Sequence, residues 1–175
     1  KLGLNDPIKK FLPDYPNKEA AEKVTIQHLL SMQSGIGDFF GDRYIGTPKE
    51  RIRSINDYLP LFADKPLEFE PGTRNRYSNG GYIVLGAIIE KVSGTDYYSF
   101  VRDNIFKPAG MSNTDAYEKD KEVPNRAKGY TRDGEKQSWK TNYGTLPARG
   151  SSAGGGYSTA DDLLRFINAL EKGII

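Results

Sequence analysis

Apolar residues recur at three- and four-residue steps between positions 82 and 92, a spacing that places them along one face of a helix. Gly94 follows, and a left-handed glycine commonly ends a helix. Upstream, Pro71-Gly72 is typical of a turn, and a polar run then leads to Tyr77. The pattern therefore predicts a central apolar helix that is entered through a turn.

Residues that can cap a helix precede four other apolar stripes. The stripes are Ile26, Leu29 and Leu30 after Thr25; Ile52, Ile55 and Leu59 after Thr47; Tyr97, Phe100, Val101 and Ile105 after Thr95; and Leu163, Leu164, Phe166, Ile167 and Leu170 after Ser158 and Thr159. Thr47 is followed by a proline and then by Glu50, the sequence of a capping box. Ile8 and Phe11 are expected to be buried within one short helical turn, and residues 17–23 to be solvated.

The period changes after residue 124. Residues 127–131 and 135–139 flank Asp133-Gly134, a dipeptide favoured in hairpin turns, and predict a two-stranded ribbon. The sequence contains no internal repeat and no linker that would divide two domains. It therefore predicts one domain over residues 1–175, mainly α-helical with a small β-hairpin.

The net charge and the residue types present narrow the classes of function. The 25 lysines and arginines and the 23 acids leave a net charge of +2, which gives no reason to expect nucleic acid as a partner. The chain has no cysteine and a single histidine, so we expect no metal and no cofactor. No apolar run approaches the ~20 residues that span a bilayer. The hydrophobic fraction of 37% suggests a small core, or a chain that packs against another.

Two candidates for nucleophilic chemistry have structural interpretations that fit better. Ser152 stands at the centre of a Gly-x-Ser-x-Gly sequence, but the residues before it form a poor strand and no histidine follows it. We therefore expect a glycine-rich structural loop there. His28 lies between Ile26 and Leu29 without a serine or cysteine partner that can be named, so we expect it to cap or to pack.

Phe39 and Phe40 follow Asp38 on a glycine-flanked loop. They could line a substrate cleft or form a satellite of the core, and the sequence leaves both interpretations open. Arg74 and Arg76 are expected to be solvated or paired with nearby acids.

Tyr77-Ser78-Asn79 places a phenol and a carboxamide at the entrance of the central helix. Backbone N–H groups and the positive helix end face outward there, which suits an anion or a polarised carbonyl. A tyrosine can act as a general base only if its pKa falls well below ~10, and lysine ammonium groups usually lower it. The alternative is a turn tyrosine followed by an asparagine helix cap.

An ordered set of segments extends this motif over essentially the whole chain. The segments are Thr25 to Leu30 (TIQHLL) with Ser34-Gly35-Ile36, residues 68–72 (EFEPG), Tyr77-Ser78-Asn79, residues 86–90 (GAIIE), 108–111 (PAGM), and 153–155 (AGG) with 157–163 (YSTADDL). In this order they resemble the class C β-lactamase and penicillin-binding-protein family of serine hydrolases. The resemblance implies that Tyr77 is the catalytic tyrosine that helps to move the proton of the nucleophile. It also implies that Asn79 binds the amide of the substrate, in a reaction that passes through an acyl-enzyme.

The departure from the family concerns the nucleophile. The family carries it in a Ser-x-x-Lys motif, and no lysine of this chain has a serine three residues before it. The Lys-Thr-Gly or His-x-Gly motif is also missing. The resemblance therefore implies a fragment: the helical portion of a β-lactamase/transpeptidase-like fold that lacks most of the antiparallel sheet and is inactive alone. The chain begins with Lys1, from which we expect a mature or excised form.

A second hypothesis is a non-catalytic module that binds peptidoglycan or a β-lactam. A third is a helical scaffold that only pairs with another chain. The fragment hypothesis predicts that the central and final helices leave apolar faces exposed, through which a homodimer could form. The family resemblance suggests the bacterial periplasm or cell envelope as the location, and a small molecule or a peptide as the substrate.

Overall fold

The computed structural model describes residues 2–132 and 138–175, in which helices predominate and the one sheet is a two-stranded antiparallel hairpin. In chain order, the helices and strands are α1 (Lys18–Lys23), α2 (Ile26–Leu30), α3 (Asp42–Gly46), α4 (Ile55–Tyr58), α5 (Asn79–Ser93), α6 (Tyr97–Val101), β1 (Tyr130–Arg132), β2 (Trp139–Thr141) and α7 (Ala160–Glu171). A π-helical turn (Arg102–Phe106) extends α6, and 3-10 turns occupy Ile8–Lys10, Lys49–Arg51, Leu59–Leu61 and Tyr143–Thr145. The predicted fold class, mainly α with a small hairpin, is confirmed.

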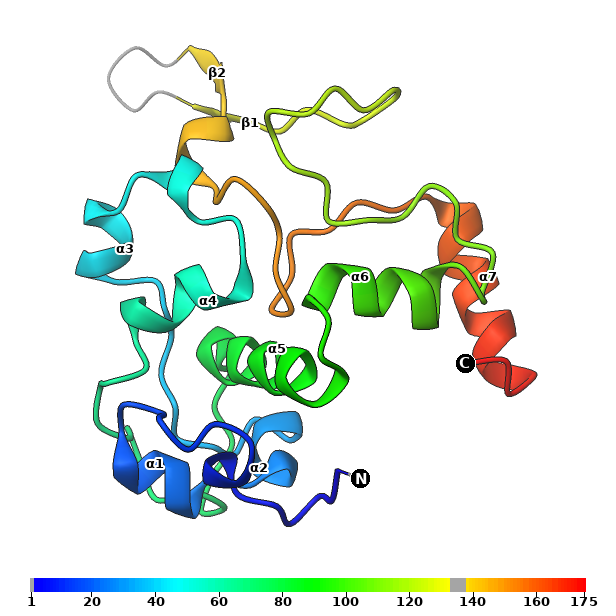
Figure 1. Ribbon diagram of the computed structural model, residues 1–175. Helices are drawn as coiled ribbons and strands as arrows, with labels where there is room; N and C mark the ends of the chain where they lie inside the picture. Colours follow the sequence, from blue (N-terminus) through cyan, green and yellow to red (C-terminus); the bar gives the residue numbers. More distant parts are fainter. Residues whose placement is uncertain (1, 133–137) are drawn as a thin grey trace.

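Helix α5 is the element around which the others are arranged. In Figure 1, α1 and α2 lie on one side of α5, and α4 and α6 lie on the other. Direct contacts join α5 to α2, α4 and α6. The predicted central helix is therefore confirmed, although it begins at Asn79, three residues before the apolar period starts. It ends at Gly94, which is left-handed with φ 72°, as predicted.

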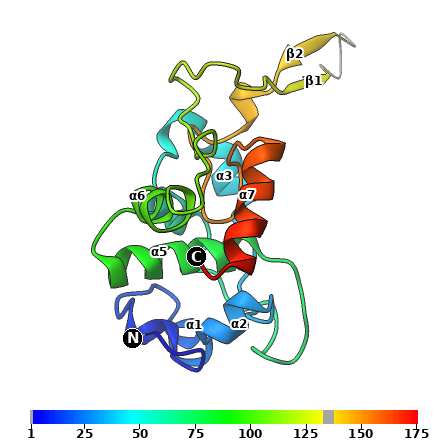
Figure 2. The ribbon, with the colours of Figure 1, turned by 90° about the vertical axis from the view of Figure 1, so that its right-hand side faces the viewer.

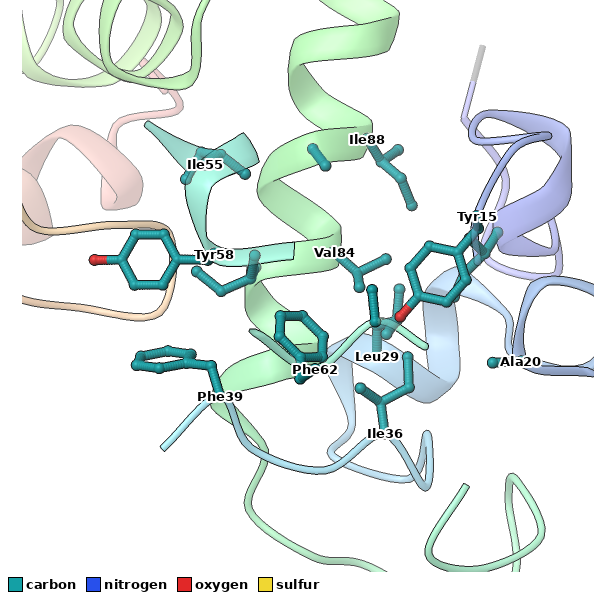
Figure 3. Packing of buried hydrophobic residues seen from close by; sticks show 14 of the residues in the cluster. Tyr15, Ala20, Leu29, Ile36, Phe39, Ile55, Tyr58, Phe62, Val84 and Ile88 are labelled. Carbon is teal, nitrogen blue, oxygen red and sulfur yellow. The ribbon is translucent and has the colours of Figure 1, made fainter. Parts of the chain in front are cut away.

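The core lies along α5. Figure 3 shows Leu29 and Ile36 on the side of α5 that carries Val84, and Ile55 on the opposite side of the helix. The cluster draws its apolar side chains from the N-terminal half of the chain, including Ile8 and Phe11, which are buried as expected. The short helices before α5 are thus held by burial in this core more than by their own length, because isolated helices of this size are marginal in water.

Helix α1 corrects the expectation that residues 17–23 are solvated. Asn17 caps this helix by accepting a hydrogen bond from Ala20 N at 3.0 Å, and both Ala20 and Ala21 are buried. The polar side chains around two small alanines hid the buried face from the apolar pattern. By contrast, the predicted Thr25 cap of α2 is confirmed, since Thr25 Oγ1 accepts from His28 N at 3.3 Å.

Two predicted caps are wrong. Thr47 does not start a helix, because its hydroxyl donates to the carbonyl of Arg43 at 2.6 Å and only a 3-10 turn follows. Ser54 starts α4 instead, with its side chain bonded to Asp57. Thr95 is likewise displaced by its neighbour Asp96, whose carboxylate accepts from Ser99 N at 3.0 Å. A carboxylate is the stronger partner for the positive end of a helix.

The hairpin pairs Tyr130 with Thr141 and Arg132 with Trp139 in antiparallel register. The predicted ribbon is confirmed, although β2 begins at Trp139, the last residue of the predicted stretch, and continues to Thr141. The predicted turn at Asp133-Gly134 lies outside the described residues.

Helix α7 differs from α5 in its surroundings. Thr159 caps α7 by accepting from Asp162 N at 3.2 Å, as predicted. Helix α7 lies at the edge of the molecule in Figure 1 and on the side turned toward the viewer in Figure 2. Its apolar stripe is half exposed, comprising Leu163, Leu164, Ile167 and Leu170. An exposed apolar face is therefore confirmed for the final helix and wrong for the central helix, whose apolar residues this chain largely covers itself.

The part of the chain covered by residues 2–132 and 138–175 has no helix whose length and apolar content would allow it to cross a membrane.

Candidate functional site

The entrance of α5 brings Tyr77 and Asn79 together. Ser78 is extended, with φ −144° and ψ 107°, so the residues on either side of it point to the same side of the chain. Tyr77 Oη donates a hydrogen bond to Asn79 Oδ1 at 3.1 Å. Ser78 itself turns inward, is buried, and caps α5 by accepting from Gly81 N at 2.9 Å. The helix cap is thus Ser78, and Asn79 is left free for other contacts.

A glycine-rich loop, residues 32–41, packs directly against this entrance. Ser78 Oγ donates to the carbonyl of Gly37 at 3.2 Å. A methyl group on Gly80 would lie 2.3 Å from that same carbonyl oxygen, so only glycine permits the approach. Asp38, the next residue of the loop, accepts from Asn79 Nδ2 at 2.6 Å. The sequence-based interpretation missed Asp38 as a site residue, and its only local signal was an acid after Ser34-Gly35-Ile36-Gly37.

Backbone hydrogen bonds hold the loop against the strand-like segment that leads to Tyr77. They run from Glu68 N to Gly35 O at 2.8 Å, from Gly72 N to Gln33 O at 2.9 Å and from Arg76 N to Met32 O at 2.9 Å. Met32 is left-handed, with φ 59°, and its sulfur accepts from Ser78 N at 3.4 Å. The two segments therefore form one scaffold that fixes Asp38 and Asn79 relative to each other.

The basic residues before Tyr77 are solvated or paired, as expected: Arg74 is exposed, and Arg76 is paired with an acid. Arg76 forms an ion pair with Glu68 at 2.7 Å, and the guanidinium of Arg74 lies over the ring of Phe69. His28 has the capping role predicted for it, because its Nδ1 accepts from Thr25 N at 3.3 Å. These side chains therefore stabilise the loop and the segments around it.

A cavity of about 240 Å³ opens beside Asn79. Its walls include Phe39 and Phe40, together with Tyr58, Tyr117, Lys119, Leu146, Pro147, Arg149, Tyr157 and the loop of residues 150–155. Phe39 is 5% exposed and packs edge-on against Tyr58, with ring centroids 4.9 Å apart, whereas Phe40 is 58% exposed. Phe39 is thus both a core residue and a cavity wall. Tyr77 does not belong to the described lining of this cavity, and its side chain is 68% exposed.

Burial governs the electrostatics of this cavity. It raises the pKa of Tyr58 and of Tyr117, and it lowers the pKa of Lys119. The Lys119 ammonium donates to the carbonyls of Tyr143 and Leu146. Arg149 is stacked on the ring of Tyr98, 3.5 Å from its centroid. The walls are therefore poorly hydrated and carry two cationic side chains held by the protein.

A second cavity, of about 230 Å³, shares Ser151 and Tyr157 with the first. None of the sequence-predicted site residues lines it. Within residues 2–132 and 138–175, no group of three or more histidine, aspartate and glutamate side chains is arranged to hold a metal ion.

Ser152 has the structural role expected of it. Its hydroxyl donates to the carbonyl of Tyr82 at 2.7 Å, so the loop of residues 150–155 rests on α5. A methyl group on Gly86 would lie 2.4 Å from Ser152 Oγ, so Gly86 permits this contact.

Comparison with known proteins identifies the family. The beta-lactamase family model matches residues 1–175. The chain is 33% identical over 181 residues to a penicillin-binding protein of Bacillus subtilis (strain 168), covering 97% of this chain and 39% of that protein. The chain therefore belongs to the beta-lactamase family, whose members are serine hydrolases.

Solved structures agree with this assignment. The penicillin-binding protein from Bacillus halodurans superposes with a TM-score of 0.89 at 37% identity, over 99% of this chain and 52% of that one. The D-amino acid amidase from Ochrobactrum anthropi SV3 superposes with a TM-score of 0.76 at 26% identity, over 98% of this chain and 50% of that one. The chain thus spans about half the length of the solved relatives and less of the Bacillus subtilis relative.

Proposed function

We propose that this chain forms the tyrosine–asparagine side of the active site of a serine hydrolase that cleaves amides or esters. The observation that carries the proposal is the hydrogen-bonded row of Tyr77, Asn79 and Asp38 at the entrance of α5, beside an aromatic cavity. In this arrangement Tyr77 is the catalytic tyrosine, and Asn79 binds the amide of the substrate. Phe39 and Phe40 provide the apolar wall of the substrate cleft.

The chemistry is acyl transfer. A serine oxygen attacks the carbonyl carbon of the substrate and gives up its proton, which Tyr77 helps to move to the leaving group. The bond to the leaving nitrogen or oxygen then breaks and an acyl-enzyme remains. Water attacks this ester, releases the acid and restores the serine. The exposed phenol of Tyr77 is accessible to such a nucleophile without movement of the core.

The relatives and the cavity support a proposal for the substrate class. The relatives named above are penicillin-binding proteins and a D-amino acid amidase. We infer a β-lactam, a D-alanyl peptide or an ester as the substrate of the whole protein. The cavity supports this range, since its aromatic walls suit an apolar acyl group and Asn79 supplies an amide partner.

The chain alone is inactive in this proposal. The nucleophile of the family lies in Ser-x-x-Lys, and no such sequence occurs among the 175 residues. Residues 1–175 then constitute one partial domain, and the rest of the site comes from other parts of the parent protein. The direct test is hydrolysis of nitrocefin and of p-nitrophenyl acetate by the isolated chain. The expected rate equals that of buffer, and hydrolysis that disappears in Tyr77→Phe would overturn the claim of inactivity.

The alternative, a non-catalytic module for peptidoglycan or β-lactams, makes a different prediction for binding. A half-built site should give no saturable titration with D-Ala-D-Ala peptides. A saturable titration, lost in Asn79→Ala and accompanied by no hydrolysis, would favour the binding module.

A further inference from the structure

Asp38 is the one acidic side chain that contacts the Tyr77–Asn79 pair within the described residues, and the family motif does not include it. We propose that Asp38 is a positioning residue that fixes which end of the Asn79 carboxamide faces Tyr77 and which hydrogen is left for the cavity. The proposal rests on the proposed function only in the purpose that it gives to Asn79.

The chemistry of the two partners allows one orientation. A carboxylate can only accept hydrogen bonds, so the amide nitrogen of Asn79 must face Asp38. The distance of 2.6 Å from Asn79 Nδ2 to Asp38 Oδ2 is short, as expected when the acceptor is charged. Turning the carboxamide by half a rotation would place its oxygen against the carboxylate. The oxygen therefore stays on the side of Tyr77, whose hydroxyl donates to it at 3.1 Å.

Asp38 is itself held in place. Its Oδ1 accepts from Phe40 N at 3.0 Å, which closes a turn within the loop. The residue before it, Gly37, is pinned to the entrance of α5 through Ser78 Oγ. Asp38 and Asn79 are 41 residues apart in sequence, yet the close approach of Gly80 to the Gly37 carbonyl brings the loop and the helix entrance together. The carboxylate is thus preorganised to orient the amide.

One consequence concerns the substrate. Tyr77 occupies the oxygen of the carboxamide and Asp38 takes one of its two N–H groups. The hydrogen that remains on Nδ2 is the polar group that Asn79 offers beside the cavity that it lines. Asn79 therefore has one N–H group left to donate beside the cavity, which would suit a carbonyl oxygen of a substrate.

A purely structural role for Asp38, closing the turn at Phe40, predicts that Asp38→Asn leaves the Asn79 carboxamide as it is. The positioning role predicts that the carboxamide turns over. Asp38→Asn retains an oxygen for Phe40 N but presents an NH2 group to Asn79. The Asn79 carboxamide must then turn over and direct its NH2 toward Tyr77. Asp38→Ala removes both contacts and reports the cost of losing the turn.

The experiment is NMR of the isotopically labelled 175-residue chain, with the Asn79 side-chain NH2 signals assigned by their loss in Asn79→Asp. In Asp38→Asn we expect an upfield shift of the hydrogen released from the carboxylate. We also expect new nuclear Overhauser effects from the Asn79 NH2 to the Tyr77 ring. Unchanged Asn79 signals in a folded Asp38→Asn protein would overturn the proposal.

Thermal unfolding provides the second readout. Asn79→Asp sets two carboxylates against each other and should lower Tm. The exchanged pair, Asp38→Asn with Asn79→Asp, restores one donor and one acceptor and should recover much of that loss. A turn role alone predicts additive losses and no recovery. Both readouts are taken without substrate, so a negative result removes the role of Asp38 and leaves the proposed function to the hydrolysis tests on the chain.

Discussion

Helices α5 and α7 both carry apolar residues at helical spacing but have opposite fates in the fold: α5 is apolar on most of its sides, whereas α7 is apolar along one side only. Helix α5 buries Ile83, Val84 and Ile88 against helices that come from the same chain. Helix α7 buries only Asp162 and Ala169 and leaves its leucines half exposed. The difference shows that periodicity indicates which face of a helix is apolar, and that the presence of a partner decides whether that face is covered.

The two helices are also fastened differently. Apolar packing holds α5, whereas a buried polar anchor holds the first turn of α7. Asp162 accepts from Asn113 N at 2.7 Å and from Thr114 Oγ1 at 2.8 Å. A helix held in this way can keep an apolar face free for a further partner, which the fragment hypothesis requires.

The largest contrast in stability is expected between substitutions of one isoleucine in each helix. Ile88 is 1% exposed and Ile167 is 52% exposed. Ile88→Ala should lower the free energy of unfolding by about 2–5 kcal/mol, because it leaves a cavity in the core. Ile167→Ala should change it by less than ~0.5 kcal/mol. Urea denaturation of both variants measures the contrast, and equal losses would show that α7 is packed as tightly as α5.

The polar anchor of α7 comes next. Asp162→Ala removes the buried carboxylate that accepts from Asn113 N and Thr114 Oγ1 and should cost about 1–3 kcal/mol. Asp161→Ala is the matched control, since Asp161 is exposed in the same helical turn and contributes only ~0.3–1 kcal/mol through the helix dipole. Hydrogen exchange of the α7 amides should accelerate in Asp162→Ala alone. If both variants behaved alike, the anchor would be unimportant.

Self-association of the isolated chain tests the exposed face directly. We propose that two copies pair through Leu164 and Ile167 of α7. Leu164→Lys should abolish concentration-dependent sedimentation and reduce ANS fluorescence, with a change in stability below ~0.5 kcal/mol. Ile45→Lys is the control, because Ile45 is 76% exposed on α3, away from this face. A wild-type chain that is monomeric and does not bind ANS would contradict this proposal.

The smallest effect is expected near the end of α5, at Glu90. Burial raises the pKa of its carboxyl, and the Oε1 atom accepts from Tyr97 N at 3.0 Å. The folded state therefore binds the proton more tightly than the unfolded state. Stability is greater below the unfolded pKa and declines as the pH rises through the folded pKa, from near 4.5 upward.

Glu90→Gln imitates the protonated group and keeps an acceptor for Tyr97 N. It should be slightly more stable than the wild type at neutral pH and should lose that advantage in acid. Urea midpoints at several pH values measure the difference, and a constant difference at all pH values would exclude Glu90 as its source.

Local signals allowed much of the fold to be predicted. The Thr25 and Thr159 caps and the Gly94 stop act within a few residues of the chain, and all three were predicted correctly. The failures at Thr47 and Thr95 arose where a second polar side chain, or a carbonyl four residues back, competed for the same role. Propensity ranks such candidates but cannot choose between them, because the free-energy differences are only tenths of a kcal/mol to ~1 kcal/mol.

The candidate site likewise combines residues that the sequence predicted with one that it missed. Tyr77 and Asn79 were predicted because their motif is contiguous, and their catalytic and binding roles stay predictions. Asp38 was missed because its contact with Asn79 spans 41 residues and depends on the Gly37 carbonyl meeting the helix entrance. A local sequence pattern does not indicate contacts between segments so far apart in the chain.

The sequence by itself determined the helical class, the central helix, most of the residues that begin and end helices, and the family. Only the tertiary structure decided which apolar faces are covered and which acid orients the Asn79 carboxamide. The physical reason is range. Periodicity and caps act over one or two turns, whereas burial and the contact between Asp38 and Asn79 exist only after segments distant in sequence have packed around α5.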